Sequence, residues 1–321
     1  MREKSYLEAI KEAVWQGMEA EKYMFVLGEG SDPALGSFHR SSEMFKQFGE
    51  DRIFDTPLSE VAMQGISIGA AMNGVKSIMV WFRLDFMLMA FDQIINHASK
   101  LKYIYDLDCP IVMKTTIGRG WGQGPNHSQS FHSVFSHFPG LKVVLPSNPY
   151  DAKGLMTAAI KDKNPIIFIE HKSLFNEVCK VPDEIYEIPI GKGEIKKNGK
   201  DVTIVAFSTM VLESLIAAKE LESQDIDAEV IDLRSSYPLD QDLIIKSVKK
   251  TGRLVIADID WLFCGIGAEI SAIIIENCFS FLKSPIKRVG LPHVSHPTSF
   301  ALEELLYPTH KDIINAVKEI L

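Results

Sequence analysis

Long apolar runs are missing from this 321-residue chain. The most apolar stretch, Ile78–Phe91, is interrupted by Arg83 and Asp85 and is too short to span a bilayer. The N-terminal residues Met1–Lys4 lead into a charged amphipathic stretch and not into the apolar core of a signal peptide. We therefore expect a cytoplasmic protein with no membrane association.

Paired cysteines and basic blocks are missing as well. The four cysteines lie far apart and form no CxxC pair, which indicates free thiols of a reducing compartment and argues against a disulfide framework or a zinc site. The net charge is −8, and no stripe of Lys and Arg alternates with aromatic residues, so nucleic-acid binding is not expected. A composition of 46% hydrophobic and 24% charged residues is globular, and the length suits two domains.

Several motifs of known chemistry are also absent. Neither a Walker A loop nor a GxGxxG fingerprint occurs, which argues against a P-loop NTPase and a Rossmann dehydrogenase. His127, His132 and His137 follow one another in steps of five, and each step rotates a helix by about 500°, so a shared zinc-binding face is not expected. His293 and His296 lie in a proline-bounded loop, which favours a surface or interface role.

The most informative segment is Ile111–Gly140. It begins as a buried strand and runs into a glycine cluster, followed by His127-Ser128-Gln129-Ser130. Its glycines are Gly118, Gly120, Gly122 and Gly124. Glycine allows positive φ and close approach, and an open α/β sheet binds ligands on loops that follow its strands. The alternative is a flexible loop ahead of a helix that Ser128 or Ser130 caps.

Strands and helices alternate through the first 170 residues, which predicts a parallel sheet with helices on both faces. The expected strands are Met24–Leu27, Ile53-Phe54, Ser77–Phe82, Ile111–Met113, Leu141–Leu145 and Pro165–Glu170. The expected helices are Tyr6–Glu21, Glu60–Asn73 and Tyr150–Lys161, with one more from Asp85 to Tyr105 on the spacing of its apolar residues.

The mixed segment Lys172–Lys200 reads as an interdomain crossover, after which a second α/β unit begins. Its expected strands are Asp201–Phe207, Ala228–Leu233, Leu254–Asp258 and Lys287–Leu291. Its expected helices are Val211–Leu221, Leu243–Thr251, Ala268–Cys278 and Thr309–Leu321.

Two carboxylates follow strands of the first domain. Glu29 lies between Gly28 and Gly30, where it serves a site or merely accepts loop N–H bonds. Ser59 is a candidate N-cap, which puts Glu60 in the first turn of a helix, where a carboxylate also complements the helix dipole. The same helix is rich in small residues, so something is expected to pack very close to it: Ala62, Gly65, Gly69, Ala70 and Ala71.

Six runs of the chain resemble the beta subunits of thiamine-diphosphate-dependent 2-oxo acid dehydrogenases. They are FDTPLSE at Phe54–Glu60, FDQIINHASKLKY at Phe91–Tyr103, GPNHSQS at Gly124–Ser130, PGLKVVLPSNPYDAKGL at Pro139–Leu155, VIDLRSSYPLD at Val230–Asp240 and GIGAEI at Gly265–Ile270. The resemblance covers both domains nearly end to end. The family includes the pyruvate, branched-chain and acetoin dehydrogenase beta subunits, and it is more distantly similar to the back half of transketolase.

The resemblance implies an α/β fold of two doubly wound domains. A thiamine-diphosphate pyrimidine-binding domain over residues 1–185 would precede a transketolase C-terminal domain over residues 186–321. It also implies an oxidoreductase that decarboxylates a 2-oxo acid and passes the acyl group to the lipoyl group of an acyltransferase component.

Roles for five residues follow from the matched motifs. Glu60 would hydrogen-bond the aminopyrimidine ring of the cofactor and hold a proton at a ring nitrogen, work that needs a carboxyl group in an apolar pocket. Phe82 and Phe86 match positions that pack around that ring, and Glu29 matches an acidic residue behind Glu60. His127 matches a histidine that reaches the substrate, for carboxylate contact or proton transfer.

The resemblance also implies metal sites and a partner. Four residues match positions that hold a structural K⁺ ion, largely through backbone carbonyls. They are Ile111, Ala159, Asp162 and Asn164. The GDG motif that binds Mg²⁺ and diphosphate in this family occurs nowhere in the chain. That half of the site is therefore expected from an alpha subunit in an α2β2 heterotetramer.

Departures from the family pattern surround the substrate end. The loop after Tyr103 reads IYDLDCP, the glycine-rich segment TTIGRGWGQGP is a variant with Trp121 near His127, and Val80 stands where many relatives carry glutamate. We therefore predict only a 2-oxo acid substrate. One alternative keeps the cofactor but not the lipoyl acceptor, as in a two-chain transketolase-like enzyme or carboligase. Another is a non-catalytic α/β binding subunit, such as half of an electron-transfer flavoprotein.

Overall fold

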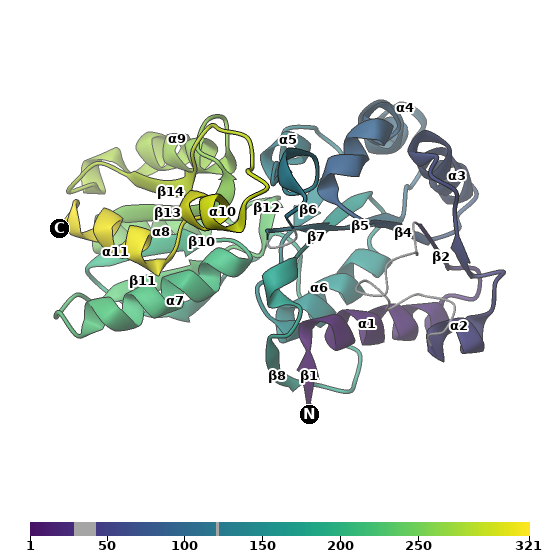
Figure 1. The fold of residues 1–321 in the computed structure, drawn as a ribbon, viewed down its shortest axis with the longest axis horizontal. Helices are drawn as coiled ribbons and strands as arrows, with labels where there is room; N and C mark the ends of the chain where they lie inside the picture. The colour runs from purple at the N-terminus through teal and green to yellow at the C-terminus, as the bar shows by residue number, and fades with distance from the viewer. Residues whose placement is uncertain (29–42, 120–121) are drawn as a thin grey trace. The chain divides into compact units, whose positions relative to one another are not determined.

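The computed structural model describes residues 1–28, 43–119 and 122–321 (Figure 1). By its internal contacts the chain divides into two units. The first comprises Met1–Gly118 and Phe135–Ile190, and the second comprises Arg119–Val134 and Gly191–Leu321. Among the described helices, none has the length and apolar character needed to cross a membrane.

The first unit is built on the parallel sheet that the sequence predicts. Its strands are β2 (Phe25–Gly28), β3 (Ile53–Asp55), β4 (Ser77–Trp81), β5 (Ile111–Ile117), β6 (Lys142–Val144) and β7 (Ile166–His171). They lie in the order β6-β7-β5-β4-β2-β3, and each neighbouring pair is parallel. Strands β3 and β4 lie on opposite sides of β2, so the order of the strands reverses at this point. The topological switch point of the sheet therefore lies between β2 and β4.

The helices of the first unit are α1 (Tyr6–Ala20), α2 (Glu43–Phe48), α3 (Glu60–Met72), α4 (Leu101–Tyr105) and α6 (Pro149–Lys161), while α5 (His132–Ser136) spans the boundary between units. Helices α1, α3 and α6 match the prediction, whereas α2 was not predicted. A capping box of Ser5 and Glu8 starts α1, which packs against α6. A short antiparallel pair, β1 (Arg2–Ser5) with β8 (Val178–Val181), escaped the sequence prediction.

The segment expected as one helix from Asp85 to Tyr105 is helical throughout, as predicted, but it is not one regular α-helix. The chain instead forms the 3₁₀ helix η2 (Leu84–Ala90), the π-helix η3 (Gln93–His97), the 3₁₀ helix η4 (Ala98–Lys100) and α4. The Ser99 hydroxyl donates to the Ile95 carbonyl at 2.6 Å and so competes with the backbone ladder. A Cβ on Gly140 would lie 2.0 Å from the Ser99 carbonyl oxygen, so a second segment also crowds this point.

The second unit is a second sheet with helices on both faces. Its strands β9 (Glu194–Lys197), β10 (Val202–Ala206), β11 (Ala228–Asp232), β13 (Leu254–Trp261) and β14 (Lys287–Leu291) lie in the order β14-β13-β10-β11-β9, and only β9 is antiparallel. Its helices are α7 (Thr209–Glu222), α8 (Gln241–Thr251), α9 (Ile266–Cys278), α10 (Phe300–Leu306) and α11 (His310–Lys318). Helix α8 packs with α9, and α7 packs with α11 on the other face (Figure 1).

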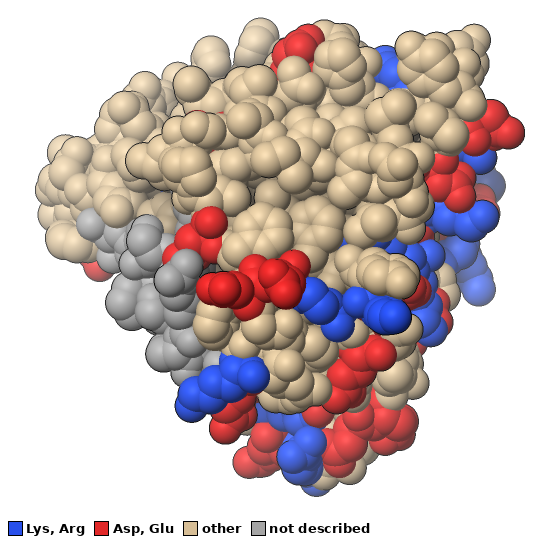
Figure 2. Space-filling model, turned by 90° about the vertical axis from the view of Figure 1, so that its right-hand side faces the viewer, with Lys and Arg blue, Asp and Glu red and all other residues tan. Residues whose placement is uncertain are grey.

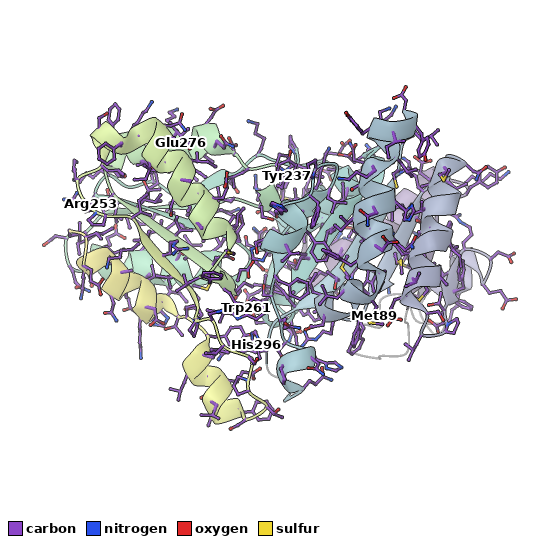
Figure 3. All side chains as sticks on the ribbon, turned by 90° about the horizontal axis from the view of Figure 1, so that it is seen from above. Met89, Tyr237, Arg253, Trp261, Glu276 and His296 are labelled. Atoms are coloured by element: carbon purple, nitrogen blue, oxygen red, sulfur yellow. The ribbon has the colours of Figure 1, made fainter. Side chains whose placement is uncertain are left out.

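Most elements of the second unit match the prediction, whereas β9, the short strand β12 (Ser235–Tyr237) and α10 were not predicted. The surface role expected for His296 is wrong. The side chain of His296 is buried between two aromatic rings. The centroid of its imidazole ring lies 6.0 Å from that of Trp261 and 5.7 Å from that of Tyr307. Figure 3 shows Trp261 and His296 close to each other. His293 is exposed, as expected.

Candidate functional site

The carboxyl edge of the first sheet gathers the predicted cofactor residues of the first unit. Glu60 follows β3, and Phe82 follows β4, on the two strands that flank β2. The backbone is tight here, because a Cβ on Gly28, at the end of β2, would lie 2.2 Å from the Val80 carbonyl oxygen. Open α/β sheets bind ligands at such an edge, beside the switch point.

Glu60 is the first residue of α3, with Ser59 at the N-cap position as predicted. The Ser59 hydroxyl makes no capping hydrogen bond. The Glu60 side chain is half-buried and makes no hydrogen bond or ion pair with any residue that the structure describes. Its carboxylate therefore stands at the positive end of a helix without a partner in the described part of the chain, which suits a ligand-binding group.

Phe82 and Phe86 lie together, as the resemblance implies. Their rings stack with centroids 6.3 Å apart and an interplanar angle of 25°, and both side chains are half-buried. Phe86 belongs to η2, which packs against α3, so the helix that begins at Glu60 also supports this aromatic pair. Glu29 lies outside the described residues.

Buried charged residues below this edge were missed as a group by the sequence reasoning. Arg83 is fully buried and donates to the Gly118 carbonyl at 2.9 Å. Lys114 on β5 and Glu170 on β7 form a buried ion pair at 2.8 Å. The signal was available, because Arg83 and Asp85 interrupt an otherwise apolar run.

One motif in α3 is excluded by its position. Gly65-Ile66-Ser67-Ile68-Gly69 has the GxSxG spacing of a serine-hydrolase nucleophile, which belongs on a strand-to-helix turn. Here Ser67 lies inside the helix, is fully buried, and faces the sulfur of Met79 at 3.9 Å. The run is therefore structural.

His127 belongs to the second unit, on the glycine-rich segment Arg119–Val134. It is half-buried and ends the 3₁₀ turn Gly124–Asn126. The described part of the segment is held by several contacts. The Tyr307 hydroxyl donates to the Ser128 carbonyl at 3.2 Å, and the Arg119 guanidinium lies 4.9 Å from the Tyr307 ring centroid.

Glycine is required at two described positions near this segment. Gly124 has φ +70°, and a Cβ there would lie 2.6 Å from the Thr298 hydroxyl. Gly118, in the first unit, has φ +106°, and its Cβ would lie 2.8 Å from the His171 ring. Both positions combine positive φ with close approach, which side chains other than hydrogen tolerate poorly.

His132, five residues after His127, forms a buried cluster with Asp258 and Asp260 in the second unit. Its Nε2 lies 3.1 Å from Asp258 Oδ2, and its Nδ1 lies 3.9 Å from Asp260 Oδ2 and 3.5 Å from the Ser130 hydroxyl. Burial alone would lower the pKa of His132, but the two carboxylates outweigh it and raise this pKa to about 9. The sequence signal was limited to two aspartates at a strand end.

The four residues predicted to hold K⁺ lie at the opposite, amino-terminal edge of the first sheet. Ile111 starts β5, Ala159 lies in the last turn of α6, and Asp162 caps that helix. Asp162 Oδ1 accepts bonds from the backbone N–H and side-chain amide of Asn164, both at 2.9 Å, and its other oxygen pairs with Lys142. The Cys109 N–H donates to the Lys163 carbonyl at 2.8 Å and so joins the start of β5 to this turn.

Comparison with known proteins agrees with this organisation. Residues 2–177 match the family described as transketolase, pyrimidine binding domain, and residues 191–313 match transketolase, C-terminal domain. A solved structure titled split gene transketolase, inactive beta4 tetramer, has a TM-score of 0.81 with 23% identity and covers 98% of this chain and 97% of that chain, which establishes the fold.

Full-length relatives are more similar in sequence. The pyruvate dehydrogenase E1 component subunit beta of Rickettsia felis is 41% identical over 98% of this chain and 97% of that protein. The 2-oxoisovalerate dehydrogenase subunit beta of Bacillus subtilis is 39% identical over 98% of each chain. The acetoin:2,6-dichlorophenolindophenol oxidoreductase subunit beta of the same organism is 38% identical over 99% of this chain and 97% of that protein. With transketolase-type pyrimidine-binding and C-terminal domains in this order, the chain belongs to the family of E1 beta subunits of 2-oxo acid dehydrogenases.

Proposed function

We propose that this chain is the beta half of a thiamine-diphosphate enzyme that decarboxylates a 2-oxo acid and delivers the acyl group to a lipoyl domain. The observation that carries the proposal is Glu60, a half-buried carboxylate without a partner among the described residues, at the switch-point edge of a pyrimidine-binding domain. The bound cofactor would supply the electron sink for loss of CO₂.

The residues of the first unit fit the aminopyrimidine half of that cofactor. Glu60 would hold a proton at a ring nitrogen, since a carboxyl group that no other described residue engages is available to a ligand. The stacked pair of Phe82 and Phe86 offers an apolar wall for a flat ring. His127 would contact the substrate carboxylate or transfer a proton, and Glu29 would support Glu60.

The diphosphate and its Mg²⁺ need a second chain, because the GDG motif is absent from this sequence. We assign that role to an alpha-type subunit in an α2β2 assembly. We expect it to dock on one face of helix α3, which we call the α3 open face. This face comprises Val61, Ala62, Gly65, Ile66 and Gly69. These side chains are exposed or half-exposed, and Val61 and Ile66 are 51% and 55% exposed. Glu60 heads the same helix, so a partner on this face reaches the site.

The surroundings of the α3 open face support an interface of this kind. Figure 2 shows that the upper part of this side of the molecule is largely uncharged, with Lys, Arg, Asp and Glu gathered below. Large apolar side chains are exposed nearby on η2 and α4, including Met89 at 64% and Tyr103 at 92% (Figure 3). Apolar surface of this extent is typical of a protein–protein contact.

A bulky residue on the α3 open face is expected to block assembly without harming the free chain. A Cβ on Gly69 meets no atom within 4 Å, so Gly69→Gln fits the isolated subunit and should hold or raise its melting temperature. We expect affinity for the alpha-type subunit to fall by about tenfold or more, because close helix packing is lost. Titration calorimetry measures this, with Gly69→Ala as the matched control that adds little bulk. Unchanged affinity of Gly69→Gln would place the partner elsewhere.

We also propose a structural K⁺ at the turn formed by Ile111, Ala159, Asp162 and Asn164. The last carbonyls of a helix lack intrahelical partners and carry the negative end of its dipole, which suits a monovalent cation. The Asp162 carboxylate is already engaged by Asn164 and Lys142, so backbone carbonyls would be the ligands. Replacing K⁺ by tetramethylammonium should lower the melting temperature by several degrees. An equal melting temperature in both salts would refute the site.

Reconstitution with an alpha-type subunit tests the function itself. The pair, supplied with thiamine diphosphate and Mg²⁺, is given pyruvate, branched 2-oxo acids and acetoin, first with 2,6-dichlorophenolindophenol and then with a lipoyl domain as acceptor. Release of CO₂ from a 2-oxo acid with acylation of the lipoyl domain is the expected result. Transfer of a ketol group between sugars without a lipoyl acceptor would establish the carboligase alternative. Absence of cofactor binding by the assembled pair would overturn the proposal.

A further inference from the structure

The cluster of His132, Asp258 and Asp260 occupies a distinctive place in the second sheet. The strand order β14-β13-β10-β11-β9 puts the topological switch point of this sheet between β10 and β13. Asp258 and Asp260 lie at the carboxyl end of β13, and Phe207 directly follows β10. The His132 ring lies 6.0 Å from the Phe207 ring, so it occupies the crevice where an open α/β sheet would receive a ligand.

Backbone contacts seat the segment of His132 at the same point. The Ser133 N–H donates to Asp260 Oδ2 at 3.1 Å, while the second oxygen of Asp260 accepts from the Trp261 N–H at 2.7 Å. The first oxygen of Asp258 accepts from the Ile259 N–H at 2.7 Å. Each carboxylate thus accepts a backbone hydrogen bond at the end of β13 with one oxygen. Its other oxygen faces the segment that carries His132 and Ser133.

The geometry favours a protonated imidazole over a metal ion. The two carboxylates face different ring nitrogens, at 3.1 Å for Nε2 with Asp258 and 3.9 Å for Nδ1 with Asp260. A carboxylate only accepts hydrogen bonds, so both ring nitrogens are best served by carrying hydrogen. A metal ion binds one nitrogen of a histidine ring, and both carboxylates would then have to face that nitrogen.

We propose that His132, held as an imidazolium between Asp258 and Asp260, locks the segment of residues 122–134 into the switch point of the second sheet and thereby positions His127 for the reaction. We assign His132 a positioning role, because its ring is buried against Asp258 and Phe207 and would act on the reaction through His127. Its role in positioning His127 rests on the proposed function, whereas the lock itself does not.

The charge of His132 gives the lock a pH dependence. Asp258 and Asp260 of β13 are charged groups that face the ring, and the Ser130 hydroxyl and the Phe207 ring also lie beside it. The pKa of His132 is raised from its usual 6.5 to about 9. The stabilisation it provides is therefore fully present below pH 6.5 and is lost as the pH rises through about 9.

Hydrogen exchange on the full chain tests the lock without any activity assay. Protection factors for amides 124–136, corrected for intrinsic exchange, are expected to fall about tenfold or more between pH 8 and pH 10 in the wild type. His132→Gln should lower them already at pH 7 and remove the pH step. His137→Gln makes the same chemical change at an exposed histidine five residues on and should behave as the wild type.

Two further experiments test the lock even if His132→Gln is poorly folded. The double variant His132→Gln/Asp258→Asn removes one of the two carboxylate charges that the first variant leaves without the imidazolium, and we expect it to recover part of the melting temperature but not the pH step. In the reconstituted enzyme, His132→Gln should lower kcat/KM for the 2-oxo acid about 10- to 100-fold with an unchanged half-saturation by thiamine diphosphate.

The results separate the lock from the function. Loss of the pH step with no catalysis in any variant would leave the lock standing and remove the proposed function. A wild-type pH step that persists in His132→Gln would overturn the lock. So would a stoichiometric divalent metal that the purified wild-type chain retains and the variant loses.

Discussion

Replacing Glu60 by glutamine is expected to lower the turnover number of the reconstituted enzyme by about 100- to 10,000-fold. Glutamine keeps the size and hydrogen-bonding reach of the side chain but holds no transferable proton. The change leaves α3 intact, because Glu60 makes no contact with the described part of the chain that the substitution would break. Steady-state assays of CO₂ release measure the effect, and thiamine diphosphate titration should show binding within a few fold of the wild type.

The control for this variant is Asp55→Asn, which removes another carboxylate at the end of β3. Asp55 is exposed, so turnover should change by less than about twofold. Equal turnover of Glu60→Gln and the wild type would remove Glu60 from the proton chemistry and, with it, the main support for the proposed function.

Replacing Lys114 by methionine is expected to destabilise the chain by about 3–5 kcal/mol, because it leaves Glu170 as an unpaired buried charge. The two side chains are 4% and 0% exposed, and their charged atoms lie 2.8 Å apart on neighbouring strands. Melting temperature measures the loss, and a shift on the order of 10 °C corresponds to this energy.

The matched control is the double variant Lys114→Met/Glu170→Gln, which removes both charges and should recover most of the stability. Burial raises the pKa of Glu170, and Lys114 opposes that effect. Without Lys114 the carboxylate is harder to keep charged, so the loss of stability should grow as the pH rises and shrink at low pH. A loss that is the same at pH 5 and pH 8 would contradict this account of the pair.

The order of strands and helices was predictable because each element carries its own period. Helix α1 shows why, since most of its apolar residues recur at helical spacing and are buried, and the helix packs against α6. The segment from Asp85 to Tyr105 has an equally regular pattern and is helical throughout, yet it changes between 3₁₀, π and α geometry. A local hydrogen bond from Ser99 to Ile95 and the close approach of Gly140 to Ser99 lie within this segment. The spacing of apolar residues predicts which face of a helix is buried. It does not predict which other segments pack against that face.

The residues of the candidate site were predictable only where they lie in local sequence motifs. Glu60, Phe82 and Phe86 lie within short matched motifs next to strand ends, so a resemblance carries them over one by one. The pairs Lys114 with Glu170 and His132 with Asp258 join residues 56 and 126 positions apart. No local pattern links such positions, because only the register of the sheet and the path of the inserted segment bring them together.

The segment that fills the second switch point also acts as a ligand supplied by the chain itself. Because it is tethered, its effective concentration at the crevice is set by the connecting chain and reaches the millimolar range or above. A diffusing metabolite of ordinary abundance would compete poorly against it. Release of this tethered segment, and not the shaping of a new cavity, would therefore be the shortest route to a second binding site at this sheet.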